Sequence, residues 1–168
     1  ITEIKINKIL EIAGTALLDE KGAYKLTIDS QQNKLLQMMQ HRTDGDFSLT
    51  LSAPPSLAGT DSEMNKFSFS VQRMKVKTKA RYDQTFVFDI DVKMTVGISE
   101  KLFPFDLRKN YKKLEKDLNK QLQSQFNSLV RKIQKARIDP IGLGLYARAY
   151  AYPEWKKVQD RWGEALSE

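Results

Sequence analysis

Three groups of residues in this 168-residue chain have types that could carry out chemistry. His41 could act as a general base near neutral pH, as in a Ser-His-Asp hydrolase, but it is the only His and no Ser lies in a strand-turn-helix elbow. Asp89 and Asp91 could form an acid and base pair or bind a divalent cation. Gly142-Leu143-Gly144 could approach a phosphate, but it follows Asp139-Pro140 rather than a strand.

A non-catalytic interpretation explains each of these groups better. His41 falls at the end of a short Met-rich helical pattern, where a surface or helix-end residue is expected, and it has no second His to share a metal. Asp89 and Asp91 lie on one strand face, opposite a strand that carries lysines. The glycine segment lacks the trailing Gly or Lys-Ser/Thr of a phosphate loop. The sequence therefore predicts no catalytic residue, metal site or cofactor, and a binding or assembly domain rather than an enzyme.

Length and composition fit a single globular domain over residues 1–168, with 40% hydrophobic and 10% aromatic residues. No run of about 18 apolar residues could cross a membrane, and the N-terminal residues lack the basic and apolar regions of a signal peptide. The chain does not begin with Met, which indicates a fragment or a processed chain. The count of zero Cys excludes disulfides and thiolate chemistry but does not fix the compartment.

The N-terminal part predicts a hairpin followed by a short helix. Apolar residues alternate from Ile4 to Ile28 on either side of a turn at Lys21-Gly22. Asp29 or Ser30 can cap the helix, because a side-chain oxygen there accepts from free backbone N–H groups. A further strand carries alternating apolar residues between 47 and 51.

The middle of the chain predicts a longer hairpin. Within residues 66–82 the apolar positions change from odd to even near Gln72-Arg73, which predicts a β-bulge because an inserted residue restores the side-chain direction. The next strand keeps even parity over residues 86–96. A turn near Asp83 would place Asp89 and Asp91 opposite Lys75, Lys77 and Lys79.

Asp106 is a plausible cap for a long helix from Leu107 to about Arg137. Its apolar positions recur at steps of three and four: Leu107, Tyr111, Leu114, Leu118, Leu122, Phe126, Leu129 and Ile133. The opposite face carries Lys109, Lys112, Lys113, Lys116 and Lys120. Ten Lys or Arg against two acids give this helix a local net charge of +8, more than the +7 of the whole chain.

This basic helix face has two interpretations. A solvated surface needs no partner, although like charges four residues apart cost about 0.2 to 0.5 kcal/mol per pair. The functional interpretation is attraction to anionic lipid, where each basic residue adds on the order of 1 kcal/mol. Nucleic acid is not predicted, because no aromatic residues are interleaved on the basic face and no reader motif occurs.

The C-terminal residues carry the most distinctive motif. Asp139-Pro140 pairs a capping acid with a Pro at a first helical position, so a helix is expected to begin there and to end at Tyr152-Pro153. A final helix carries an apolar face of Trp155, Val158, Trp162 and Leu166. Both indoles are then expected to pack against the rest of the domain as core anchors. The less favoured interpretation is that they form an exposed surface that binds a ligand.

The order Asp139-Pro140-x-Gly142-x-Gly144, then Pro153-x-Trp155 and Trp162, resembles the C-terminal end of the Ger(x)C family, the C subunits of spore germinant receptors. An extended segment at 10–18 and the long helix before the motif also match that family's arrangement. The resemblance implies an exported lipoprotein, tethered by an N-terminal lipid outside these residues to the spore inner membrane. It also implies that the subunit works with A and B membrane subunits and has no catalytic residues.

We therefore expect an α+β fold, with an antiparallel β-sheet of about five or six strands packed against one long C-terminal helix, plus short helices. The expected function is assembly within a germinant receptor. One alternative is a lipid- or small-ligand-binding module at an anionic membrane surface, which predicts an apolar cavity between the long helix and the sheet. Another is a weak hydrolase, which predicts convergent polar groups around His41. The sequence predicts neither the nutrient that triggers the receptor nor the face of the domain that contacts the A and B subunits.

Overall fold

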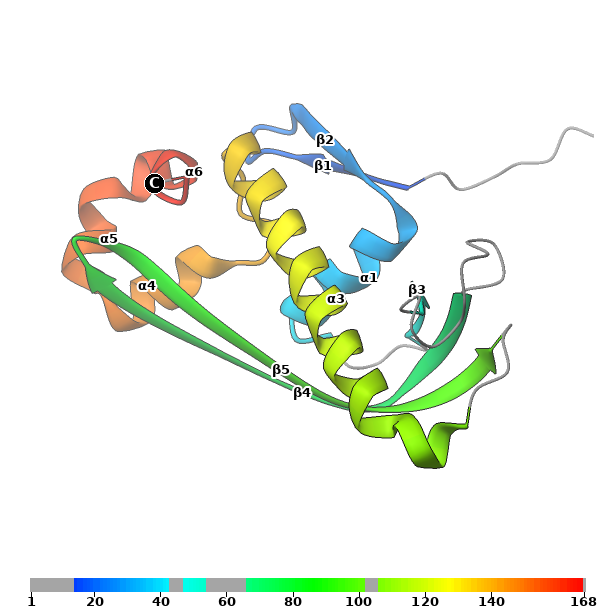
Figure 1. Ribbon diagram of the computed structural model, residues 1–168. Coiled ribbons are helices and arrows are strands. Elements are labelled where there is room, and N and C mark those ends of the chain that lie inside the picture. The colour runs from blue at the N-terminus through cyan, green and yellow to red at the C-terminus, as the bar shows by residue number, and fades with distance from the viewer. Residues whose placement is uncertain (1–13, 43–46, 54–65, 102–105, 168) are drawn as a thin grey trace, which may run out of the picture.

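The computed structural model describes residues 14–42, 47–53, 66–101 and 106–167. These residues form an α+β fold with antiparallel strand pairing, as the sequence predicts (Figure 1). The described strands are β1 (Thr15–Leu18), β2 (Tyr24–Ile28), β3 (Ser48–Ser52), β4 (Lys66–Asp83) and β5 (Thr85–Lys101). The described helices are α1 (Ser30–Met39), α3 (Leu107–Ala136), α4 (Leu143–Tyr150), α5 (Tyr152–Val158), the short 3₁₀ helix η1 (Gln159–Arg161) and α6 (Trp162–Ala165).

The five described strands are divided between two sheets, whereas the sequence prediction placed its strands in one. β1 pairs with β2 alone, and β3, β4 and β5 form a separate sheet in that order. Helix α1 begins two residues after β2 ends and separates β2 from β3 along the chain.

The first hairpin turns through Asp19 to Ala23. The Asp19 Oδ1 atom accepts from the backbone N–H groups of Lys21 at 2.9 Å and Ala23 at 2.8 Å, and Gly22 takes the positive φ of 78° that the turn requires. The hydrogen bond from Ala23 is the main cause that lowers the pKa of the Asp19 carboxyl. The first strand was predicted to begin at residue 4. In the structure β1 begins at residue 15, and residues 4–13 lie outside the described part.

Helix α1 begins with the predicted Asp29 cap. The Asp29 Oδ1 atom accepts from the Gln32 N–H at 2.8 Å, and the Gln32 side chain accepts in return from the Asp29 N–H. The apolar face predicted for this helix is buried and consists of Leu35, Leu36, Met38 and Met39. The cap and the apolar spacing together explain why these ten residues form a helix.

The β4–β5 hairpin is the longest element pair, and it bends between its open end and its closed end (Figure 1). Its register shifts between Val71 and Arg73, which confirms the predicted bulge at Gln72. It turns at Gln84, which has a φ of 60°, next to the predicted Asp83. Two of the three predicted lysines lie opposite the acids, Lys77 opposite Asp91 and Lys79 opposite Asp89, whereas Lys75 lies opposite Lys93. Only the open end of β4 pairs with β3, through Lys66 to Ser70.

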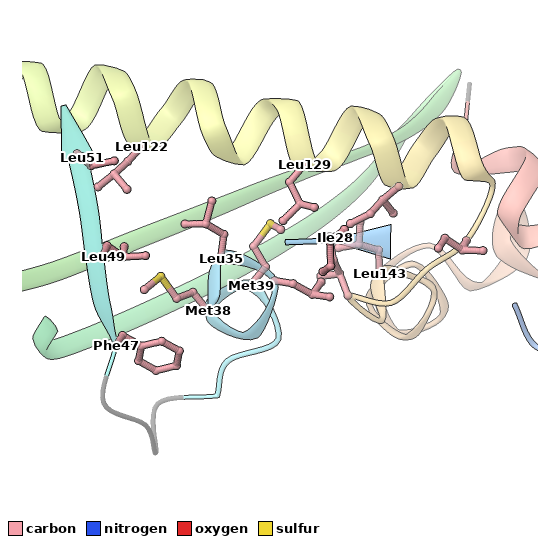
Figure 2. Close-up of a cluster of buried hydrophobic side chains, with 14 of the residues drawn as sticks. Ile28, Leu35, Met38, Met39, Phe47, Leu49, Leu51, Leu122, Leu129 and Leu143 are labelled. Carbon is pink, nitrogen blue, oxygen red and sulfur yellow. The ribbon is translucent and has the colours of Figure 1, made fainter. Parts of the chain in front are cut away.

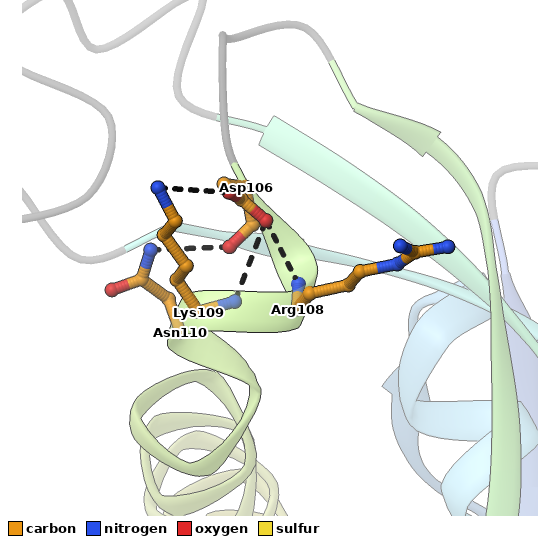
Figure 3. A network of polar contacts seen from close by, with 4 residues as sticks. All are labelled: Asp106, Arg108, Lys109 and Asn110. Atoms are coloured by element: carbon orange, nitrogen blue, oxygen red, sulfur yellow. Dashed lines mark hydrogen bonds and ion pairs between the residues drawn. The ribbon is translucent and has the colours of Figure 1, made fainter.

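Helix α3 begins at the predicted Asp106 cap. Figure 3 shows the Asp106 carboxylate accepting from the backbone N–H groups of Arg108, at 3.1 Å, and Lys109, at 3.4 Å. The helix ends at Arg137, which adopts the left-handed conformation with a φ of 55°. The predicted apolar face is wrong at Tyr111, whose side chain is 53% exposed because it lies before the first turn that contacts the core.

The core lies between α1, α3 and β3. Figure 2 shows Leu129 of α3 directed toward Leu35 and Met39 of α1, and Leu122 of α3 directed toward Leu51 of β3. All five side chains are buried. Helix α1 therefore joins the long helix to the three-stranded sheet, and it is the element that fixes α3 in place.

Candidate interaction site

The C-terminal motif is organised around one carboxylate. The Asp139 Oδ1 atom accepts from the backbone N–H groups of Gly142 and Leu143, each at 2.9 Å, and Oδ2 accepts from Gly144 at 2.7 Å. The Oδ2 atom also accepts from the indole Nε1–H of Trp162 at 2.8 Å. Asp139 thus satisfies the free amides at the start of α4 and holds a side chain 23 residues further along the chain.

The glycines of the motif are required by local geometry. Gly142 has a φ of 86°, which a residue with a side chain adopts only with strain. A Cβ at Gly144 would lie 2.9 Å from the Trp162 Nε1 atom, so the helix and the indole can meet only when residue 144 has no side chain. The left-handed Gly142 also explains why α4 begins at Leu143 and not at Pro140, where the sequence prediction placed it.

The two tryptophans have different surroundings. Trp162 is buried, and its ring packs edge-on against Phe86 and Phe88 of β5, with centroids 5.1 and 6.3 Å away. Trp155 is half-buried and lies against Tyr152 and beneath the Arg148 guanidinium, 5.5 Å from the ring centroid. Core anchoring, expected for both, therefore describes Trp162 fully and Trp155 in part.

The predicted final helix is broken into α5, η1 and α6. Its last segment, α6, approaches the end of α3 closely, since a Cβ at Gly163 would lie 2.0 Å from the backbone carbonyl oxygen of Arg137. Pro153 stands in the first turn of α5, away from Asp139. The structure therefore brings Asp139, Gly142, Gly144 and Trp162 together, and leaves Pro153 and Trp155 at the neighbouring helix.

The predicted basic face of α3 is exposed at every position: Lys109, Lys112, Lys113, Lys116 and Lys120. The Lys109 Nζ atom lies 3.7 Å from the Asp106 carboxylate, and the Lys112 ammonium lies 6.0 Å from the centroid of the Tyr111 ring. Both contacts are at the solvent-exposed surface, where they contribute little. The face can therefore present a nearly uncompensated positive charge to a partner.

A second basic surface lies on β4, where the sequence predicted three lysines on one strand face but not the arginines that extend the row at both ends. It is an alternating row of five exposed residues: Arg73, Lys75, Lys77, Lys79 and Arg81. In the described residues, Arg81 forms an ion pair with Asp89, while Asp91 lies 3.7 Å from Lys93 on its own strand. The sequence predicted that Asp89 and Asp91 pair with the lysines of this row. The two acids balance only part of the positive charge of the row. The alternation of basic residues after the bulge was the feature of the sequence that could have predicted this surface.

An apolar groove lies between α3 and β5, beside the C-terminal helices. Its volume is about 780 Å³. The groove side of β5 includes the half-buried Phe86, Phe88, Ile90, Val92 and Met94, and the groove side of α3 includes Leu122, Phe126, Val130 and Ile133. Periodicity identified eight of these nine residues, all but Val130, as positions on an apolar face, but it did not show that a groove separates the two faces.

His41 lies directly after α1, as the helix-end interpretation predicts. Its Nε2 atom is 2.9 Å from the Thr78 hydroxyl of β4 and 3.2 Å from the Tyr146 hydroxyl of α4. All three side chains are near the surface, and the contacts tie the end of α1 to β4 and α4. His41 does not line the apolar groove.

Within the described ranges, no three His, Asp or Glu side chains gather closely enough to hold a metal ion. In the same part of the chain, each helix is either too short or too polar to cross a membrane. The fold and these surfaces define an α+β domain with a hydrogen-bonded C-terminal motif, two basic surfaces and one apolar groove.

The comparisons with known proteins agree with the motif. Residues 13–168 match the family described as Spore germination B3/GerAC like, C-terminal. The chain is 32% identical over 166 residues to the Spore germination protein KC of Bacillus subtilis (strain 168), across 92% of this chain and 37% of that protein. Its fold is similar to the crystal structure of the GerBC protein, with a TM-score of 0.69 and 20% identity across 92% of this chain and 47% of that one.

The chain belongs to the spore germination B3/GerAC-like family, and the Ger(x)C resemblance drawn from its C-terminal motif is confirmed. It spans less than half the length of each of the two relatives.

Proposed function

We propose that this chain is the C-terminal domain of the C subunit of a nutrient germinant receptor, and that it acts by assembly with the A and B membrane subunits. The observation that carries the proposal is the family match over residues 13–168, which includes the whole Asp139 to Trp162 motif. The curated relative is a spore germination protein, and this chain aligns with 37% of it. The domain would then be one folded unit of a longer lipoprotein.

The proposal includes a non-enzymatic role at the outer surface of the spore inner membrane. A lipid on the N-terminal part of the longer protein would tether the domain there. The chemistry of the described residues supports this role, because the Asp139 carboxylate is already satisfied by four donors and His41 contacts two hydroxyls near the surface. Both groups are occupied in holding the fold.

Assembly can be tested in spores that carry the full-length subunit. A photocrosslinking residue is placed at Lys113 on α3, at Lys77 on β4, or at Tyr150 on α4, which are three exposed positions on different elements. A crosslink to the A or B subunit from at least one position is expected. Deletion of residues 14–167 should abolish the response to nutrients and leave a nutrient-independent trigger effective. Normal nutrient germination after this deletion would refute the proposal.

We also propose that the basic face of α3 orients the domain on anionic lipid. The five lysines of this face are all exposed, and each one held near the surface of such a membrane contributes on the order of 1 kcal/mol. Changing Lys109, Lys112, Lys113 and Lys116 to Glu should lower binding more than about a hundredfold in a flotation assay with phosphatidylglycerol vesicles. Binding of the parent chain should weaken as salt rises.

The row on β4 supplies a matched control for the flotation assay. Changing Lys75, Lys77 and Lys79 to Glu alters a similar charge on a different surface. If these changes abolish binding while the α3 changes leave it intact, the membrane side of the domain is β4 and the proposal for α3 is wrong.

A second candidate function is a lipid- or small-ligand-binding module at the membrane surface. The observation that favours it is the groove between α3 and β5, since a ligand module predicts an apolar cavity between the long helix and the sheet. Its volume of about 780 Å³ lies within the range of about 300 to 1,000 Å³ that small-molecule sites occupy. The two functions are compatible, because the groove and the basic faces involve different side chains.

A further inference from the structure

The outward face of the β4–β5 hairpin carries more positive charge than its own acids balance. The row on β4 contributes five exposed cations, and Lys93 on β5 adds a sixth on the same face. Opposite the row, the exposed acids are Asp89 and Asp91. Arg81 pairs with Asp89, and the Lys93 ammonium lies 3.7 Å from the Asp91 carboxylate, so each acid already has a basic partner.

Two of these cations lie in an arrangement that costs stability. Lys75 and Lys93 are directly opposite each other across the two strands. Side chains at such positions have Cβ atoms about 4.5 to 5.5 Å apart, and like charges there are destabilising. Arg73 and Lys77 also flank Lys75 on its own strand, each at about 6.8 Å. In the part of the chain that the structure describes, no carboxylate lies within 4.0 Å of the Lys75 ammonium, so an external carboxylate would relieve this repulsion.

We propose that the row on β4 binds an acidic segment of a partner protein, which lies along the strand in an extended conformation. This inference rests on the proposed function, because the partner would be another receptor subunit. It adds the surface of this chain that the subunit contacts and the chemistry of the segment that it presents. The occupant is chosen by charge complementarity, which gives an interface its specificity and its association rate.

The spacing of the row favours an extended segment. Basic residues occupy every second position from Arg73 to Arg81, at intervals of about 6.8 Å and over about 27 Å in total. Acidic residues at alternate positions of an extended polypeptide recur at the same interval, so all of them can lie beside the row. Acidic residues four apart on an α-helix advance about 6 Å and turn by about 40° at each step, so they soon point away from it.

The acids beside the row distinguish a polypeptide from a membrane surface. Asp91 and Asp89 lie opposite Lys77 and Lys79, one strand away, which is about 4.8 Å. This separation is shorter than the screening length of about 8 Å at physiological salt, so the acids act on whatever covers the face. An anionic membrane would extend over both strands and meet the acids as well as the row. A single segment can follow β4 alone, so the mixed charge favours a protein partner.

The first test measures binding of labelled peptides to the 168-residue chain by fluorescence anisotropy at physiological salt. One peptide alternates Glu and Thr over nine residues, and a second has the same composition with its five Glu together in the middle. The alternating peptide should bind at least about fourfold more tightly, because two more of its acids can reach the row and each exposed ion pair contributes about two- to fivefold. Equal affinities would overturn the extended register. Equally tight binding of an oligothymidylate with five phosphates would show general polyanion binding and overturn the proposal.

Charge reversal locates the binding surface. The test variant changes three residues of the row: Lys75→Glu, Lys77→Glu and Lys79→Glu. The control variant makes the same change in net charge on α3: Lys109→Glu, Lys112→Glu and Lys113→Glu. The row variant should bind the alternating peptide at least about tenfold more weakly, and the α3 variant should change the affinity less than about threefold. Circular dichroism checks that both are folded. Equal losses in the two variants would show that affinity follows net charge alone and would overturn the site.

The repulsion between Lys75 and Lys93 has its own test. Lys75→Gln should raise the midpoint of urea unfolding, because it removes the like-charge pair, and should also weaken binding of the alternating peptide by about two- to fivefold. Lys79 lies opposite Asp89, so Lys79→Gln should weaken peptide binding without raising the midpoint. A lower midpoint in Lys75→Gln would show that the opposed lysines do not destabilise the face and would overturn the proposal.

Receptor assembly is measured with the full-length subunit in spores. The row variant should lose co-purification with the A and B subunits, whereas the α3 variant should retain it. If both variants co-purify normally and only deletion of residues 14–167 abolishes the nutrient response, the row is not the contact surface and the assignment to a receptor stands. If the row variant co-purifies normally but no longer binds phosphatidylglycerol vesicles, the row faces lipid and the proposal is overturned.

Discussion

Replacement of Trp162 by Ala should produce the largest loss of stability in the C-terminal motif. The side chain is 7% exposed, packs on two phenylalanines of β5 and donates its indole N–H to Asp139. Truncation of a buried Trp to Ala costs about 3 to 5 kcal/mol. Because a domain of this size is stable by only about 5 to 15 kcal/mol, the variant should lose a third or more of its margin.

The contributions to this loss can be separated with a second variant. Trp162→Phe keeps an aromatic ring against Phe86 and Phe88, but removes one of the four donors to the Asp139 carboxylate. A hydrogen bond to a charged group contributes about 1.5 to 3 kcal/mol, so the Phe variant should lose less than the Ala variant. Trp155→Ala is the matched control, because the same change at a half-buried position should cost roughly half as much.

The assay is equilibrium unfolding in urea followed by far-ultraviolet circular dichroism, which does not depend on the removed indole. A loss of less than about 1 kcal/mol in Trp162→Ala would refute the reasoning that burial and the Asp139 bond hold the motif together. A variant as stable as the parent that no longer assembles with the A and B subunits would make Trp162 an interface residue.

Three further predictions concern other positions. Gly163→Ala should cost about 1 to 3 kcal/mol in urea unfolding, because its Cβ would meet the Arg137 carbonyl oxygen; an unchanged midpoint would contradict this close approach. Asp106→Ala should cost about 1 kcal/mol by the same measurement, as loss of the α3 cap, and Asp106→Ser should restore most of it. Asp19 has a lowered pKa in the folded chain, so it stabilises the fold above its unfolded pKa of about 3.9, and this contribution is lost as the pH falls. Thermal unfolding of Asp19→Asn should therefore depend less on pH between about 5 and 3 than that of the parent chain.

Local features of the fold could be predicted from the sequence because their causes are local. Asp29 and Asp106 cap helices through amides two or three residues away, and the bulge at Gln72 follows from a change of parity within one strand. The first hairpin was predicted correctly at its turn, but the even-numbered apolar face predicted for its first strand is wrong, because Leu17 packs toward the core while Leu18 is 54% exposed. Where two neighbouring residues are both apolar, an alternating pattern does not show which of the two faces the core.

The remaining features depend on contacts between distant parts of the chain. The capping role of Asp139 is visible in the sequence, but its bond to Trp162 is not, since it requires the tail to return to α4. Periodicity likewise places Phe126 and Val92 on apolar faces. It does not show whether the two residues contact each other or line a groove between the faces. The division of the strands into two sheets is of the same kind, because pairing partners are chosen in three dimensions.

The contact between Trp162 and Phe86 also has a consequence for the order of folding. The β4–β5 hairpin closes between neighbouring residues, and hairpins of this kind form within about 1 to 10 μs. Trp162 lies 76 positions after Phe86, so their contact requires closure of a much longer loop and is expected to form after the main barrier. Loss of the indole should therefore accelerate unfolding far more than it slows folding. The C-terminal motif would then determine how long the domain stays folded.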